Sequence, residues 1–103
     1  MHAVRPPSAE ELLSVLAPFS RISYRMRGIC LELSTVLPYE KTVDIIVTGS
    51  SIIIDTGRAR VEAPYTGFAV ACTRAMRIDG GARCTYSEVV VTRCPWGTSL
   101  TLL

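Results

Sequence analysis

From residue 21 to the C-terminus, apolar and polar residues alternate in short runs, most of them separated by glycine or proline. Alternation with a period of two is typical of β-strands that bury one face. The alternating runs cover residues 21–36, 43–47, 58–62, 68–78, 84–94 and 99–102, and residues 52–54 are a continuous β-branched run of three isoleucines. Because 103 residues make one domain of ordinary size, the pattern predicts a single β-rich domain.

A helix is predicted only at the N-terminal side of this β-rich region. Ser8 and Glu11 fit a capping box, and an apolar stripe (Leu12, Val15, Leu16 and Phe19) follows at helical spacing. Pro18 ends the helix, which is expected over residues 9–17. We therefore expect an α+β fold over residues 8–103, after a flexible stretch at 1–7. A mainly antiparallel sheet of five to six strands would form a sandwich or a partly open barrel, with the N-terminal helix packed on it.

Two places along the chain predict turns or junctions between strands. After Gly28 the apolar residues move to the other set of alternate positions. This change of phase predicts either a β-bulge or two strands that meet at the glycine. Residues 38–41, which begin with a proline, are expected to form a turn.

A hairpin is the strongest long-range signal in the sequence. The glycines of the segment 79–82 can adopt the positive φ of a two-residue turn, so 68–78 is predicted to pair with 84–94. In that register Cys72 and Cys84 point to opposite faces of the sheet, which excludes a bond between them.

The cysteines are expected to be reduced and to pack as small apolar residues. No two of them form a C-x-x-C pair, and the only histidine is His2, so neither a metal site nor a cofactor is predicted. Two on one predicted strand, Cys84 and Cys94, would lie about 33 Å apart, too far for a disulfide. At most one bridge remains open, and it would involve Cys30.

The charge and the hydropathy pattern limit where the chain works. The net charge of +2 does not indicate a strongly basic nucleic-acid domain. No signal-peptide core and no apolar run long enough for a membrane helix is visible. We therefore expect a soluble, intracellular protein of the cytoplasm or nucleus, without a membrane partner.

One string, residues 52–57, is the most specific candidate for a catalytic motif: three isoleucines followed by Asp55, Thr56 and Gly57. It resembles the active-site signature of the retroviral-type aspartic proteases, in which two chains each supply one aspartate. The resemblance implies a homodimer with Asp55 as the catalytic residue. That family normally has a small residue after the glycine, where this chain has Arg58. The other interpretation, an ordinary turn built from Asp and Gly, is the one we favour.

Arginine dominates the basic residues, since Lys41 is the only lysine among eleven. The candidate binding residues are arginines in two groups, Arg21, Arg25 and Arg27 in the first and Arg74 and Arg77 in the second, together with Trp96. On a small β-barrel, arginines beside Tyr24 or Tyr86 would suit single-stranded nucleic acid, which is the less favoured alternative.

A protein-binding role is the interpretation that we favour, because arginine and tryptophan often supply most of the binding energy of an interface. Trp96 is expected to pack in the core, with an anchor in an interface as the alternative. The chain is thus predicted to be a non-enzymatic interaction module, a subunit or an inhibitor of a larger assembly. Its partner is an unknown protein or a second copy of the chain in a homodimer.

Overall fold

The computed structural model describes residues 4–103, so His2 and the start of the predicted flexible stretch lie outside the described part. The described residues form one helix, α1 (Ala9–Leu16), followed by a mixed sheet of eight strands. The strands are β1 (Ser23–Arg27), β2 (Cys30–Val47), β3 (Ser51–Asp55), β4 (Arg60–Pro64), β5 (Phe68–Cys72), β6 (Ala75–Ile78), β7 (Gly81–Cys94) and β8 (Gly97–Leu102). The predicted α+β class with one N-terminal helix is confirmed.

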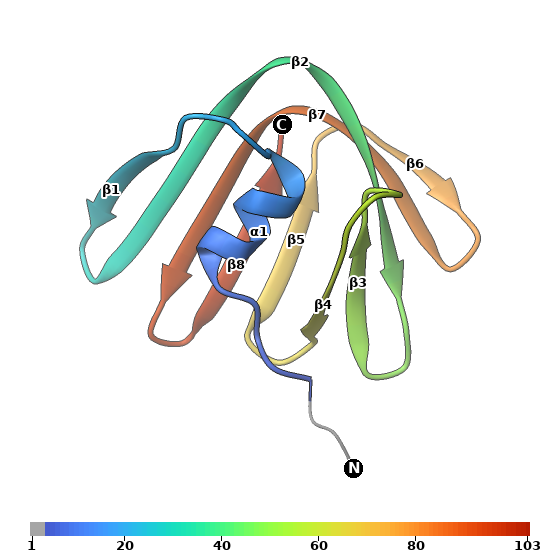
Figure 1. Ribbon diagram of the computed structural model, residues 1–103. Coiled ribbons are helices and arrows are strands. Elements are labelled where there is room, and N and C mark those ends of the chain that lie inside the picture. Colours follow the sequence, from blue (N-terminus) through green and yellow to red (C-terminus); the bar gives the residue numbers. More distant parts are fainter. Residues whose placement is uncertain (1–3) are drawn as a thin grey trace.

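The long strands β2 and β7 pair along most of their length and arch over the molecule together (Figure 1). Each half of the arch carries further strands, and we call the two halves limbs. The first limb has the order β1–β2–β7–β8–β5, and the second has the order β4–β3–β2–β7–β6. The sheet is therefore open, and β2 and β7 belong to both limbs.

The sheet has more strands than the five or six expected because two predicted strands are divided. The segment 21–36 breaks at Gly28, where φ is +61°. Strands β1 and β2 therefore meet at this glycine, which was one of the two predicted alternatives. The segment 68–78 breaks after Cys72. Its first part, β5, pairs with β8 in parallel, and only its second part, β6, forms the hairpin with β7.

The arch bends where β2 carries extra residues. Val36 pairs with Glu88 and Lys41 pairs with Tyr86, so the four residues 37–40 lie opposite Ser87 alone. A turn was predicted for 38–41, and this was wrong: the segment is a large bulge inside β2. Proline has no N–H to donate to a ladder, and a bulge is one of the few places in a sheet that accepts it.

Helix α1 lies between the limbs, beneath the arch (Figure 1), and contacts β7 and β4. Its cap is the one predicted: the Ser8 hydroxyl accepts a hydrogen bond from the Glu11 amide at 3.0 Å. Leu12, Leu13 and Leu16 are fully buried. The expected stripe was wrong at Phe19, which follows Pro18, has a φ of +64° and is exposed.

A buried hydroxyl joins the helix to the arch. Tyr86 of β7 is 1% exposed, and its hydroxyl donates a hydrogen bond to the Leu16 carbonyl at 2.7 Å. This carbonyl is in the last turn of α1, where no further helical N–H can reach it. Tyr86 therefore satisfies a polar group that would otherwise be buried without a partner.

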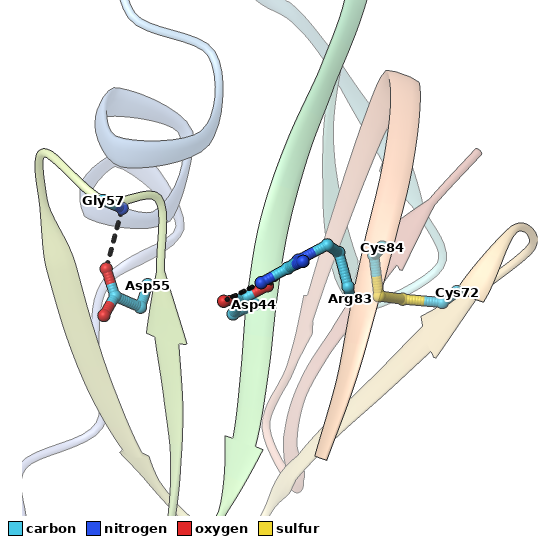
Figure 2. A network of polar contacts seen from close by, with 6 residues as sticks. All are labelled: Asp44, Asp55, Gly57, Cys72, Arg83 and Cys84. Atoms are coloured by element: carbon cyan, nitrogen blue, oxygen red, sulfur yellow. Dashed lines mark hydrogen bonds and ion pairs between the residues drawn. A yellow bond between two sulfur atoms is a disulfide. The ribbon is translucent and has the colours of Figure 1, made fainter. Parts of the chain in front are cut away.

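Both pairs of cysteines are bonded, so the expectation of reduced cysteines was wrong. Cys30 is bonded to Cys94, with their Cα atoms 4.3 Å apart, and Cys72 to Cys84, with their Cα atoms 6.0 Å apart. The predicted hairpin excluded the second bond because it kept Cys72 in the ladder with β7. In the structure the chain bends between β5 and β6, which brings Cys72 beside Cys84 instead (Figure 2).

Replacing Tyr86 with phenylalanine should lower the free energy of unfolding by about 1–3 kcal/mol, because the Leu16 carbonyl loses its buried partner. Chemical denaturation measures the change. Tyr39→Phe is the matched control, since this hydroxyl has no hydrogen bond within residues 4–103 and the side chain is exposed. Equal stability of the two variants would show that the Tyr86 bond contributes nothing.

The stability of the wild type and that of Tyr86→Phe should also respond differently to alkaline pH. Burial raises the pKa of Tyr86 from 10.0 to about 12, since it disfavours the phenolate. The neutral phenol therefore stabilises the folded state fully below pH 10, and this contribution is lost as the pH rises to about 12. The stability difference between wild type and Tyr86→Phe should shrink over that interval in denaturation curves taken at each pH.

The two disulfides should stabilise the fold unequally. The bonded residues are 64 positions apart in Cys30–Cys94 and 12 apart in Cys72–Cys84. A longer closed loop restricts the unfolded chain more, so removing the first bridge should cost about 1.5 kcal/mol more than removing the second. Denaturation of the two double alanine variants measures this. The wild type, denatured without reductant, should show no free thiol, and a reversed order of the variants would refute the loop argument.

Candidate functional site

The two predicted groups of arginines lie on opposite flanks of the arch. Arg25 and Arg27 are on β1, which pairs with β2, and Arg21 precedes this strand. Arg77 is on β6, which pairs with β7, and Arg74 lies just before it. The structure therefore does not bring the groups together into one basic patch. Arg74 is moreover paired with Glu40, on the bulge of β2.

The first limb ends in two turns that a disulfide ties together. Cys30 follows the turn between β1 and β2, and Cys94 precedes the turn between β7 and β8. Ile29 and Trp96, which lie in these turns, are therefore close to the same bridge. Both are largely exposed, at 66% and 71%. We call Arg25, Met26, Arg27, Ile29 and Trp96 together the limb-tip surface.

Trp96 does not pack in the core, so that expectation was wrong. Cys94 and Gly97 pair with each other, which leaves Pro95 and Trp96 as a two-residue hairpin turn. A side chain at such a position lies beyond the end of the ladder, outside the reach of the core. Ile29 and Met26 were not among the binding residues predicted from the sequence. Their signal was present, because an apolar residue beside the turn at Gly28 has no strand to cover it.

Strand β1 is an edge strand whose five residues are all exposed. Tyr24 and Met26 lie opposite Leu33 and Leu31, so they extend the core face of the sheet beyond the core. Arg25 alternates with them and therefore points to the other face. It lies opposite Glu32, whose carboxylate is 3.2 Å from Arg27 Nε. The strand thus presents one apolar face, one arginine face and an unpaired edge.

A hollow of about 300 Å³ adjoins the limb-tip surface. Gly97 lies so close to Gly67 that a Cβ atom on it would be 2.6 Å from the Gly67 carbonyl oxygen. Tyr65, Phe68 and Trp96 are among the side chains around this contact, and no charged residue lines the hollow. It is therefore suited to an uncharged, apolar group.

The triplet Asp55-Thr56-Gly57 forms the turn between β3 and β4, the interpretation that was favoured. Asp55 Oδ1 accepts a hydrogen bond from the Gly57 amide at 2.8 Å (Figure 2), and Gly57 has a φ of +87°. The Thr56 hydroxyl accepts hydrogen bonds from the Arg58 and Ala59 amides. All three residues of the motif therefore have a structural role in closing this turn.

A second aspartate lies opposite Asp55. Asp44 of β2 is its partner in the β2–β3 ladder, and Arg83 of β7 is the partner of Asp44 on the other side. Arg83 donates two hydrogen bonds to Asp44, at 2.8 and 3.2 Å. The hydrogen bond from Arg83 lowers the pKa of Asp44, which keeps this carboxylate ionised. Asp44 is thus unsuited to share a proton with Asp55.

Within residues 4–103, no three His, Cys, Asp or Glu side chains are grouped so that they could hold a metal ion. In the same part of the chain, no helix has the length and apolar character needed to cross a membrane. Tyr86, one of the aromatics proposed to stack on bases, is buried against α1. Tyr24 is exposed but lies on the face of β1 opposite to Arg25.

Comparisons with models of protein families, with curated protein sequences and with solved structures found no match to this chain. The candidate site therefore rests on the geometry alone. The limb-tip surface is where exposed apolar side chains, arginines and an unpaired strand edge occur together.

Replacing Arg83 with glutamine should return the pKa of Asp44 towards its usual 3.8. Because the pKa is lowered in the folded protein, the ion pair stabilises the fold above that value, and the effect is lost as the pH falls through the lowered pKa. Carbon-detected NMR of the Asp44 carboxyl group measures the titration. Arg93→Gln is the control, since this exposed arginine forms no ion pair within residues 4–103. An unchanged titration would refute the assignment.

Proposed function

We propose that the chain is a non-enzymatic protein-interaction module, a subunit or an inhibitor of a larger assembly, which binds its partner through the limb-tip surface. One observation carries the proposal: an exposed edge strand ends beside an exposed tryptophan, and a disulfide links the two turns concerned. Arginine and tryptophan are enriched among the residues that supply most of the binding energy at interfaces.

The partner supplies an extended segment that pairs with the free edge of β1. Main-chain hydrogen bonds to an exposed strand give such complexes their affinity, and alternate side chains give specificity. In the partner strand, acidic side chains face Arg25 and Arg27, and apolar side chains face Tyr24 and Met26. An apolar residue of the partner fills the hollow beside Trp96.

The two disulfides bear on where the module works. Disulfides persist in oxidising environments and are rare in the cytosol. With both pairs of cysteines bonded, we propose an oxidising compartment such as the cell exterior. The cytoplasmic or nuclear localisation expected from the sequence stays a prediction, and it requires both bridges to survive in a reducing compartment.

Two alternatives predict different behaviour. An aspartic protease homodimer that uses Asp55 would cleave unfolded substrates at mildly acidic pH, and Asp55→Asn would abolish the cleavage. A single-strand binder would retard DNA or RNA in a strongly salt-dependent way. Sedimentation tests separately whether the chain itself forms a homodimer.

Selection from a library of displayed random peptides tests the proposal without a known partner. The enriched peptides should alternate acidic and apolar residues. Arg25→Glu and Trp96→Ala should each weaken the binding of the selected peptides about 30-fold, the effect of losing about 2 kcal/mol of binding energy.

Arg77→Glu is the matched control for this experiment. It makes the same charge change at an exposed arginine on β6, on the opposite flank, and it should leave the affinity unchanged. The proposal is refuted if Arg77→Glu weakens binding as much as Arg25→Glu, or if the selected peptides show no acidic preference.

A further inference from the structure

A second hollow lies in the other limb, under the bend of the arch. It has a volume of about 460 Å³ and is bounded by the C-terminal end of α1, by β2 just after its bulge and by the β3–β4 turn. This volume is within the range of small-molecule sites. We call it the arch cleft. Its chemically informative lining residues are Tyr39, Lys41, Thr42, Thr56, Arg58 and Tyr86.

Two cations line the arch cleft, and neither has an acidic partner. Lys41 and Arg58 form no ion pair within residues 4–103, and no aspartate or glutamate is among the lining residues. The end of α1 contributes an opposing partial charge of about −0.5. Two full positive charges exceed that partial charge, so the lining of the cleft carries a net positive charge that favours an anionic ligand.

Local structure fixes the positions of the two cations. Lys41 is the first residue of β2 to pair with β7 after the bulge, directly opposite the buried Tyr86. Arg58 lies in the β3–β4 turn, where its amide donates a hydrogen bond to the Thr56 hydroxyl at 3.3 Å. The bulge and the turn thus place a lysine of β2 and an arginine of the β3–β4 turn around one hollow.

The chemistry of these groups suits the oxygens of a phosphate or sulfate group. A guanidinium can hold two oxygens of a phosphate at once, and an ammonium contributes a mobile point charge. Tyr39 is 69% exposed and provides a ring for the rest of the ligand. We infer that the arch cleft binds a small phosphorylated or sulfated molecule, with Lys41 and Arg58 on the oxyanion and Tyr39 against its organic part.

This inference does not depend on the proposed function. The arch cleft belongs to the second limb and to α1, whereas the limb-tip surface belongs to the first limb. Anion binding in the arch cleft would give a role to Arg58, the residue at which the chain departs from the aspartic protease motif, and to Lys41, the only lysine of the sequence.

Titration with inorganic phosphate, phenyl phosphate and phenyl sulfate, followed by calorimetry and amide NMR, tests the inference. Phenyl phosphate should bind with a Kd below about 1 mM, and shifted amides should lie around Lys41 and Arg58. Lys41→Met and Arg58→Met should each weaken binding at least about tenfold, the effect of losing one charge-assisted contact. A preference for phenyl phosphate over phenyl sulfate would identify the dianion as the ligand, and the reverse would identify the sulfate ester.

Two controls keep the result interpretable. Arg77→Met removes an exposed arginine elsewhere and should bind as the wild type does, and thermal melting checks that every variant is folded. Tyr39→Ala should remove the advantage of phenyl phosphate over inorganic phosphate but keep the binding of phosphate itself. Absence of saturable binding, or equal binding by the folded double variant Lys41→Met/Arg58→Met, would overturn the inference.

Discussion

The ladder between β2 and β7 is the constraint on which the rest of the structure depends. These strands are the only two that belong to both limbs of the described sheet, and the bulge at 37–40 bends their ladder into an arch. The concave face of the bent sheet is apolar, so another element has to pack against it to shield it from water. Helix α1 covers it, and the Tyr86 hydroxyl, one ladder position from the bulge, satisfies the end of the helix. The bulge also contributes Tyr39 to the lining of the arch cleft, beside the end of the helix.

The absence of asparagine and glutamine leaves hydroxyl groups to satisfy buried polar atoms. Thr35 is buried, and its hydroxyl donates a hydrogen bond at 2.6 Å to the Arg21 carbonyl, just before β1. Ser51 is buried, and its hydroxyl donates to the Glu62 carboxylate of β4 at 2.6 Å. Within residues 4–103 no buried side-chain nitrogen or oxygen lacks a hydrogen bond. Serine and threonine hydroxyls therefore suffice to satisfy the buried polar side chains, because each donates a hydrogen bond to a neighbouring segment.

The features that could be predicted from the sequence are those decided by neighbouring residues. Ser8 and Pro18 define the ends of α1 through local sterics and capping, and the Asp55 turn follows from the side-chain chemistry of its own residues. What could not be predicted depends on distant pairing. The bend after Cys72, which allows both its disulfide and the parallel pairing of β5, requires β8 to be in place. The exposure of Trp96 has a local origin instead, because the pairing of Cys94 with Gly97 leaves the indole at the tip of a hairpin turn.

The strand edges favour β1 over β4 and β6 as the edge at which we propose that a partner binds. Strand β4 ends in Pro64, which lacks an N–H, and its Glu62 is occupied by Ser51. Strand β6 has four residues, and the arginine that precedes it is paired with Glu40. Strand β1 is exposed on both faces, and the Cys30–Cys94 bridge lies directly beyond its turn. The covalent bond restricts this turn relative to Trp96. Binding of a partner strand at β1 would therefore cost less conformational entropy than binding at an unrestrained hairpin.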